Sequence, residues 1–350
     1  MIQKLLLGML IVTVPFAFIG NFLGFAATMM FIVYSLAIVS LASYIGRATE
    51  SLAIVSGPRI GGLLNVTFGN VVELTISVFA LKAGFLSIVL ASLTGAVISN
   101  LLLVAGLSFF IGGLKYKRQK FNIFDARHNA GLLMFCVVLS FVFPAVFASY
   151  LTEAEIMTMS VWIAVIMLIL YFALLYFKLV SHRGVYAQKS DGQEDEEPEW
   201  NKKKAIIILA SAAIAVAFIS DMLVDTFEVV GETFGWTELF IGVIIVAIIG
   251  NSAENITAIL MAFKNKMNIS VEIAIGSTLQ IAMFVTPLLV LLSLLLPVQM
   301  PLLFSMPALV AMVLSVFLSI FIFIDGDTNW FEGLILLAAY LIIGIGFYLI

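Results

Sequence analysis

The sequence predicts an all-α integral membrane protein with about eleven transmembrane helices, arranged as one extra N-terminal helix and two five-helix repeats of inverted topology. Of the 350 residues, 63% are hydrophobic and only 11% are charged, and the mean hydropathy is +1.19. A soluble domain has about 25% charged residues. Apolar runs such as 269–296 and 306–324 exceed the roughly 18 residues that mark a spanning helix. The strand-type alternation of a membrane barrel is absent from the sequence.

The apolar segments give the order of the expected elements. The first run begins at Leu5 after a single lysine and lacks a clear small-residue cleavage site, so we expect a retained helix rather than a signal peptide. Four regions follow: an N-terminal helix (1–24), a first repeat (25–180), an acidic cytoplasmic linker (181–203) and a second repeat (204–350). The expected spans are 3–21, 25–46, 58–82, 85–112, 129–149, 154–180, 204–229, 237–263, 269–296, 302–324 and 329–350.

Basic residues in the loops predict the orientation, because cytoplasmic loops carry an excess of Lys and Arg. The loops after the fourth, sixth and eighth spans are basic, whereas the loops between them carry Glu153, Glu155, Glu232 and Glu238. We therefore expect a cytoplasmic N-terminus and an outside C-terminus. The basic loop residues include Lys115, Lys117, Arg118, Lys120, Arg127, Arg183, Lys189, Lys202, Lys203, Lys204, Lys264 and Lys266.

Two apolar segments contain the same short phrase, Gly-Asn-x-x-Glu, at 69–73 and at 250–254. The two copies are 181 residues apart. At the same offset Gly95 matches Gly276, and the polar Ser99 falls opposite Gln280. Ionisable side chains inside spanning segments are costly and usually mark an ion or substrate pathway. The repetition therefore predicts an internally duplicated ion transporter.

Each repeat has five spans, so the second repeat enters the membrane from the side opposite to the first. Such inverted repeats place a transport site near the bilayer midplane. Glu73 is nine residues from Lys82 and Glu254 is ten from Lys264, which is about 14–15 Å of helix in each case. Both acids are thus expected near the bilayer centre, approached from opposite directions.

A midplane pair of carboxylates suits a hard divalent cation such as Ca²⁺, which takes 6–8 oxygen ligands. Glu73 and Glu254 are the predicted metal ligands, and Asn70 and Asn251 can add amide oxygens from the same helical faces. Burial and mutual repulsion also favour the protonated carboxyl, so the same groups can carry protons. The remaining residues predicted to line the pathway or break a helix are Gly69, Gly250, Ser99, Gln280, Gly95 and Gly276.

Other acids lie outside the repeated phrase. Glu50, Asp225 and Glu228 lie at the ends of spans and are candidates for the vestibules, or for solvated helix ends. The linker segment 191–199 contains six acids in nine residues. It is interpreted either as a solvated linker or as a weak cation-attracting segment.

These motifs resemble the calcium/proton antiporters, the CAX branch of the cation/calcium exchanger superfamily. The resemblance rests on GGLLNVTFGNVVE at 61–73, GNSAE at 250–254, KNKM at 264–267 and GSTLQI at 276–281, and extends over nearly the whole chain. It implies eleven helices, Ca²⁺ ejection driven by inward proton flow, and the two matching glutamates as principal ligands. It also suggests a role for the acid at Glu50.

The sequence departs from the family pattern at two places. Many members have His after the second repeat's Glu, where this chain has Asn255, and Ser after the first repeat's Gly, where it has Ala96. Sodium/calcium exchangers usually carry Pro before the repeat Glu. Val72 and Ala253 stand there instead, which favours proton over sodium coupling.

We therefore expect a secondary active transporter that exports Ca²⁺ from the cytoplasm in exchange for H⁺ by alternating access, in the plasma membrane of a bacterium. Ca²⁺ and H⁺ are its expected substrates and the lipid bilayer its surroundings, with no cofactor, no nucleic acid, no catalytic residue and no enzymatic activity. A homo-oligomer is compatible with the sequence. The alternatives are a sodium-coupled or broader divalent (Mn²⁺) exchanger and, less favoured, a cation channel.

Overall fold

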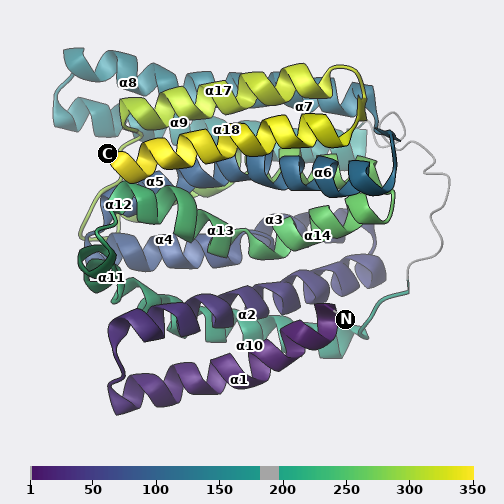
Figure 1. Cartoon of the computed structure of the whole chain (residues 1–350). Helices are drawn as coiled ribbons and strands as arrows, with labels where there is room; N and C mark the ends of the chain where they lie inside the picture. Colours follow the sequence, from purple (N-terminus) through teal and green to yellow (C-terminus); the bar gives the residue numbers. More distant parts are fainter. Residues whose placement is uncertain (1, 182–196) are drawn as a thin grey trace. The chain divides into compact units, whose positions relative to one another are not determined.

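The computed structural model describes residues 2–181 and 197–350, which are almost entirely helical (Figure 1). Within these residues, nine helices are long and apolar enough to cross a membrane. The third and eighth expected spans are instead broken into shorter helices, described with the site below. The all-α membrane fold is thus confirmed, whereas the count of eleven spans stays a prediction.

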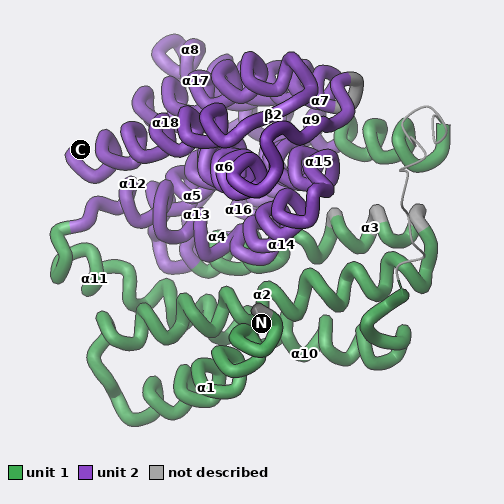
Figure 2. The backbone as a smooth tube through the Cα atoms, turned by 45° about the vertical axis from the view of Figure 1, so that its right-hand side comes forward, with its two compact units in different colours: residues 1–79, 169–235 green, residues 80–168, 236–350 purple. Residues whose placement is uncertain are grey.

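The chain divides into two compact units that do not coincide with the two sequence halves (Figure 2). Unit 1 comprises residues 1–79 and 169–235, and unit 2 comprises residues 80–168 and 236–350. Each unit therefore combines segments from both expected repeats. The repeat boundaries divide the sequence rather than the compact units, and they stay a prediction.

Unit 1 is organised around one long helix, α2. The helices α1, α3, α10 and α11 all pack against it, and α10 does so along the greatest length. Its inner face is lined by small and apolar residues such as Ala37, Ile38 and Leu41, which are buried. The helices are α1 (Ile2–Leu23), α2 (Ala27–Ser56), α3 (Pro58–Phe68), α10 (Lys202–Val224) and α11 (Phe227–Phe234), with α4 (Val71–Ala83) and α9 (Glu153–Tyr176, continued by the π-helical turn Phe177–Ser181) crossing the unit boundary.

The described end of the acidic linker is fastened to α2 inside unit 1. The Arg47 guanidinium lies 5.0 Å from the Tyr44 ring centroid and 4.9 Å from that of Trp200, whose rings stack at 14°. Arg47 Nε donates to Glu199 Oε2 at 2.8 Å, and Nη2 pairs with the other carboxylate oxygen. Asn201 then caps α10 by accepting from the Lys204 N–H. The described end of the linker is therefore held by an ion pair and by stacked side chains. The linker residues 191–196 lie outside the described residues.

Unit 2 depends on glycines where its helices meet. An added Cβ at Gly95 would overlap the Val243 carbonyl, and one at Gly242 would overlap Ala91. Small residues let membrane helices approach closely. The elements are α5 (Leu86–Ile98), α6 (Ala105–Lys115), β1 (Gln119–Lys120), α7 (Ile123–Cys136), α8 (Phe143–Phe147), α12 (Glu238–Phe240), α13 (Ala247–Gly250), α14 (Ser252–Phe263), α15 (Met267–Gln280), α16 (Thr286–Ser293), α17 (Met306–Phe323), β2 (Asp327–Thr328) and α18 (Trp330–Leu349).

Several helices of unit 2 contain π-helical turns. Turns at Ser99–Val104 and Ile281–Val285 join α5 to α6 and α15 to α16, and others lie at Val137–Val142 and Ile241–Val246. A π turn inside an α-helix is rare and often marks a functional site. The first two of these turns overlap at the repeat offset of 181, because residues 100–104 correspond to residues 281–285.

Three loops of unit 2 are joined to one another by backbone pairing, a hydrogen bond and an ion pair. β1 pairs with β2 in antiparallel register, and Arg118 forms an ion pair with Asp327, which joins the loops after the fourth and tenth expected spans. The Asn122 N–H donates to Asn268 Oδ1 at 2.8 Å and adds the loop after the eighth span. These even-numbered loops therefore share one face of unit 2.

Candidate ion-binding site

The first copy of the repeated phrase lies at a helix break in unit 1. α3 ends at Phe68 and α4 begins at Val71, with Gly69 and Asn70 forming the turn between them. Glu73 stands in the first turn of α4, and both Asn70 and Glu73 are 2% exposed. A buried acid thus follows directly after an interruption of the helix.

The second copy has the same local design in unit 2. α13 ends at Gly250, Asn251 adopts φ −98° and ψ 11°, and α14 begins at Ser252 with Glu254 in its first turn. The Asn251 amide nitrogen donates to the Ala247 carbonyl at 3.1 Å. Because Nδ2 is committed to this bond, Oδ1 is the Asn251 atom left to accept a donor or bind a cation.

At each break, the carboxyl end of one helix meets the amino end of the next, and the two helix ends have opposite partial charges. The amino end of α4 or α14 stabilises the negative charge of its own glutamate, while the carboxyl end of the preceding helix presents carbonyl oxygens that favour a cation. Discontinuous helices of this kind form the ion sites of many transporters. Each segment can therefore hold a carboxylate charge and also offer neutral oxygens to a metal ion.

Glu254 is held by a neighbouring helix. Its carboxyl accepts a hydrogen bond from the Ser277 hydroxyl on α15, which packs against α14. Its other oxygen, Oε2, is buried and forms no hydrogen bond within the described residues. Ser252 Oγ and Asn255 Oδ1 are likewise buried without a hydrogen bond there. A buried carboxylate oxygen that forms no hydrogen bond can accept a hard cation or a proton.

The far end of α14 is clamped so that the acid at its start has a fixed position. Gln119 Nε2 donates to the Ala262 carbonyl and to Asn265 Oδ1, both at 2.9 Å. Lys115 Nζ donates to the Phe263 carbonyl at 3.0 Å. These side chains satisfy carbonyls that a helix end otherwise leaves open, and the lysine charge complements the negative end of the helix.

The smaller predicted residues have varied surroundings. Gly95 and Gly276 lie inside unbroken helices, so the helix-break role does not apply to them. Gly95 serves close packing, whereas a Cβ at Gly276 would meet no heavy atom within 4 Å. Ser99 is buried at the start of a π turn, and its hydroxyl donates to the Ala96 carbonyl at 3.3 Å. Gln280 is the last residue before the corresponding π turn.

The expected vestibule acids are exposed residues of unit 1. Glu50 lies near the end of α2, Asp225 is the C-cap of α10, and Glu228 is in the first turn of α11. Asp225 lies close enough to Tyr34 for an electrostatic interaction. Their exposure fits both interpretations, vestibule and solvated helix end.

Sequence reasoning missed several polar residues beside the second acid. Ser277 lies within the GSTLQI motif and aligns with Ala96. The one signal in the sequence that could have pointed to Ser277 was that the first repeat lacks a hydroxyl at the matching position. Ser252 and Asn255 flank Glu254 and required the structure to show that they are buried. Asn100, which follows Ser99, is also buried, and its Nδ2 makes no hydrogen bond in the described part of the chain.

The model of one protein family, described as sodium/calcium exchanger protein, matches the chain twice, over residues 26–180 and 204–349. The chain belongs to the sodium/calcium exchanger protein family. The two matches nearly coincide with the two repeats expected from the sequence.

Relatives in this family carry specific names. A Ca²⁺/H⁺ antiporter, ChaA, of Bacillus subtilis (strain 168) is 62% identical over 339 residues, covering 96% of this chain and 97% of its own length. A Ca²⁺/H⁺ antiporter of Aphanothece halophytica is 40% identical and covers 97% of this chain and 95% of its own length. The resemblance to calcium/proton antiporters is thereby confirmed.

Solved structures agree with the fold. The structure of native YfkE superposes with a TM-score of 0.88 at 56% identity, covering 99% of this chain and all of that one. A structure of the H⁺/Ca²⁺ exchanger CAX has a TM-score of 0.72 at 18% identity, covering 99% of this chain and 92% of that one. At this lower identity the likeness concerns the fold alone.

Proposed function

We propose that this protein is a secondary active transporter that exports Ca²⁺ from the cytoplasm of a bacterium in exchange for H⁺. The observation that carries the proposal is the pair of matched broken helices, each with a glutamate in the first turn after a Gly-Asn break; Glu73 is buried and Glu254 is partly buried. The names of its relatives support the substrate assignment.

Several structural matches at an offset of 181 residues support the proposed duplication. The π turns after α5 and α15 begin next to Ser99 and Gln280. The helices that carry the two acids are also followed by corresponding left-handed residues: Gly84 has φ 95° and Asn265 has φ 63°. The left-handed pair was not used to find the repeat, so it is independent of the sequence motif.

The proposed chemistry is a competition between one Ca²⁺ and protons for the same oxygens. Glu73 and Glu254 provide the negative charge, with Asn70, Asn251 and backbone carbonyls as neutral ligands. When Ca²⁺ leaves, burial favours the protonated carboxyls, so the site returns across the membrane carrying protons. An empty, charged site is costly inside a bilayer, and this cost makes the exchange obligatory.

The direct test is Ca²⁺ and H⁺ flux in proteoliposomes that contain only this protein. An imposed pH gradient, acidic inside the vesicles, should drive Ca²⁺ uptake beyond the external Ca²⁺ concentration, and each Ca²⁺ taken up should release protons to the outside. Ca²⁺ movement that follows only its own gradient would contradict exchange and indicate a channel.

The same vesicles distinguish proton from sodium coupling. Uptake under the pH gradient should be unchanged when sodium is replaced by choline on both sides. A sodium gradient alone that drives Ca²⁺ accumulation would overturn the proton assignment, and Mn²⁺ uptake under the pH gradient would broaden the substrate to other divalent cations.

A further inference from the structure

A group of buried polar side chains, here called the polar column, lies in unit 2 where α6, α14 and α15 pack against one another. It consists of Ser108 on α6, Asn255 on α14, Ser270 on α15 and Gln119 in β1. All four residues are at most 8% exposed. Within the described residues, both serine hydroxyls, Asn255 Oδ1 and Gln119 Oε1 form no hydrogen bond. Burying such groups is costly unless polar partners are present, so this interface is suited to a polar occupant.

The spacing along α6 shows which neighbours its serine faces. Ser108, Gly112 and Lys115 are separated by four and three residues, so they lie on one side of the helix. A Cβ added at Gly112 would contact the Met267 side chain at the start of α15. Lys115 Nζ donates to the Phe263 carbonyl at the end of α14. The Ser108 hydroxyl therefore faces the interface with α14 and α15.

The other two helices bring small and polar residues to the same interface, and Gln119 fixes how they are aligned. The Gln119 amide lies against Gly112 of α6, and its Nε2 donates to the Ala262 carbonyl of α14. Because α6 and α14 both end at this face, four residues back along each helix, about 6 Å, places Ser108 level with Ala258. The buried residues concerned are Asn255, Ala258 and Ala262 on α14, and Met267, Ser270, Ala274 and Ser277 on α15.

The polar column extends from the second repeated acid to one face of unit 2. At its inner end, Asn255 follows Glu254 in the chain, and Glu254 accepts the hydrogen bond from Ser277. At its outer end, Gln119 belongs to the loop after the fourth expected span, on the face that the basic-loop pattern predicts to be cytoplasmic. Asn255 and Ala262 are seven residues apart, so the column is about 10 Å long.

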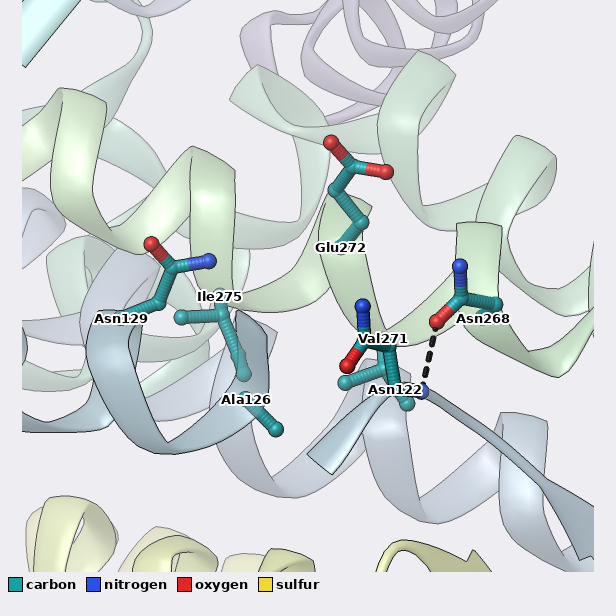
Figure 3. A pocket seen from close by; sticks show the side chains of 7 residues that line it. All are labelled: Asn122, Ala126, Asn129, Asn268, Val271, Glu272 and Ile275. Atoms are coloured by element: carbon teal, nitrogen blue, oxygen red, sulfur yellow. Dashed lines mark hydrogen bonds between the residues drawn. The ribbon is translucent and has the colours of Figure 1, made fainter. Parts of the chain in front are cut away.

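The chemistry of the polar column suits protons rather than Ca²⁺. Its four side chains are neutral, whereas Ca²⁺ sites take 6–8 oxygen ligands that usually include carboxylates. The acid of α15, Glu272, is two residues after Ser270, about 200° around the helix, and it lines a separate small pocket beside Asn268 (Figure 3). A serine hydroxyl both donates and accepts a hydrogen bond, as water does, and a chain of such groups can pass protons along.

We propose that the polar column, with bound water between its side chains, is a proton route that connects Glu254 to the cytoplasmic face of unit 2. The proposal rests on the Ca²⁺/H⁺ exchange proposed above. A proton that leaves the Glu254 carboxyl passes to a water molecule, and each water or hydroxyl that accepts a proton releases another to the next group. The hydroxyls are therefore unchanged after each transfer, and Ca²⁺ does not use this route.

The first test measures the rate of exchange and Ca²⁺ binding in the same variant. Ser108→Ala should slow Ca²⁺-coupled proton release from proteoliposomes about fivefold, the size expected for the loss of one hydrogen bond. Equilibrium Ca²⁺ binding should be unchanged, and the slowing in D₂O should be larger than in wild type. Ser140→Ala is the matched control, because the Ser140 hydroxyl is equally buried, forms no hydrogen bond to the described residues and lies in the π turn after α7. It should leave the rate unchanged.

A rescue variant distinguishes a proton route from a packing role. Ala258→Ser combined with Ser108→Ala returns a hydroxyl at the same level from the facing helix, and it should restore most of the rate. Adding Ala258→Ser to Ser140→Ala should have no such effect. If Ser108→Ala fails to fold, Ser270→Ala replaces it with the same expectations.

A second measurement detects the water itself and does not depend on transport. Hydroxyl radicals generated by X-rays from bound water label the side chains beside it. Met267, at the outer end of the interface, is 1% exposed, and Met312 on α17 is 0% exposed. In the purified full-length protein, Met267 should be labelled faster than Met312. In the double variant Ser108→Ala/Ser270→Ala, the labelling of Met267 should fall to the level of Met312.

Three results would overturn the proton route. They are a wild-type rate of exchange in both Ser108→Ala and Ser270→Ala, a slow rate that Ala258→Ser does not restore, and labelling of Met267 no faster than that of Met312. An absence of pH-driven Ca²⁺ uptake in the wild-type protein would instead contradict the proposed function, and the labelling comparison would still decide whether the polar column holds water.

Discussion

The two broken helices have the same local arrangement but differ in the length of the break and in the residue at the position of Ser277. In the first, the break covers Gly69 and Asn70, and the position in α5 that matches Ser277 is Ala96, which has no hydroxyl. In the second, the break is the single residue Asn251, and Glu254 accepts a hydrogen bond from Ser277. The difference teaches that a duplicated motif need not produce two equivalent carboxyls.

The unequal support has a chemical consequence for exchange. A hydroxyl that donates to a carboxylate stabilises its charged form relative to its protonated form. The Ser277 bond therefore favours a charged, metal-ready Glu254, and no such bond is available from the matching residue of the first repeat. The Ser277 bond tunes the Glu254 carboxyl toward the metal, and the predictions below test how much this bond contributes.

The largest effect is expected from removing either acid. Glu73→Gln and Glu254→Gln should each abolish Ca²⁺/H⁺ exchange, because one midplane carboxylate cannot supply both the charge for Ca²⁺ and the proton sites. Initial Ca²⁺ uptake into vesicles, normalised to protein and with size-exclusion profiles as the folding control, measures this. Near-wild-type uptake in one of the two would mean that the repeats have entirely separate functions.

The next effect should distinguish the two repeats. In wild type, Ca²⁺ binding weakens as pH falls because protons compete for the carboxylates. Ser277→Ala removes a hydrogen bond to a charged group, worth about 1.5–3 kcal/mol at most, so protons should compete better. The pH at half-maximal Ca²⁺ binding should rise by about one unit.

Ala96→Ser is the reciprocal change. It should move the same pH midpoint downward if the first repeat can use a hydroxyl as the second does. An unchanged midpoint in Ser277→Ala would show that the Glu254–Ser277 bond has no part in the competition between Ca²⁺ and protons.

A smaller effect is expected at the left-handed residues after α4 and α14. Gly84→Ala should lower the free energy of unfolding by about 1–2 kcal/mol, the usual cost of this conformation for a residue with a Cβ. Asn265→Ala should cost more, because Gln119 also loses an acceptor worth about 1 kcal/mol. Asn265→Gly should fall between wild type and Asn265→Ala. Thermal unfolding followed by tryptophan fluorescence ranks the three variants, and equal midpoints for Asn265→Ala and Asn265→Gly would contradict the strain at this site.

The smallest effect on transport is expected in the linker, which belongs to neither repeat. Deleting residues 191–196 should leave transport largely intact and shift its Ca²⁺ dependence only modestly. Glu199→Gln should lower the free energy of unfolding by about 0.5–1 kcal/mol, because a partly exposed ion pair contributes little. A complete loss of transport in the deletion, with normal membrane insertion, would give the linker an essential function.

The sequence predicted the membrane fold and the two acids because both leave a chemical signature in composition. A carboxylate in an apolar span is easily recognised, and here the same motif recurs in both halves of the sequence. A helix break was only one of the two roles foreseen for Gly69 and Gly250. The other was close packing between helices, which is the role that Gly95 has.

Other features had no comparable signal in the sequence. Ser277 looks like any helix-to-helix serine until α15 is packed against α14. The Arg47–Glu199 contact joins residues 152 positions apart, and composition alone made the linker look wholly solvated. Tertiary packing, rather than local pattern, decides each of these.

The matched π turns also indicate when in evolution this irregularity of the backbone arose. A π turn accommodates an extra residue within a helix, and such turns are rare. The turns after α5 and α15 overlap at the 181-residue offset over five positions, 100–104 and 281–285. Under the duplication proposed above, the extra residue was already present in an ancestral half-length gene. Its descendants have since exchanged most of their side chains while retaining this irregularity of the backbone.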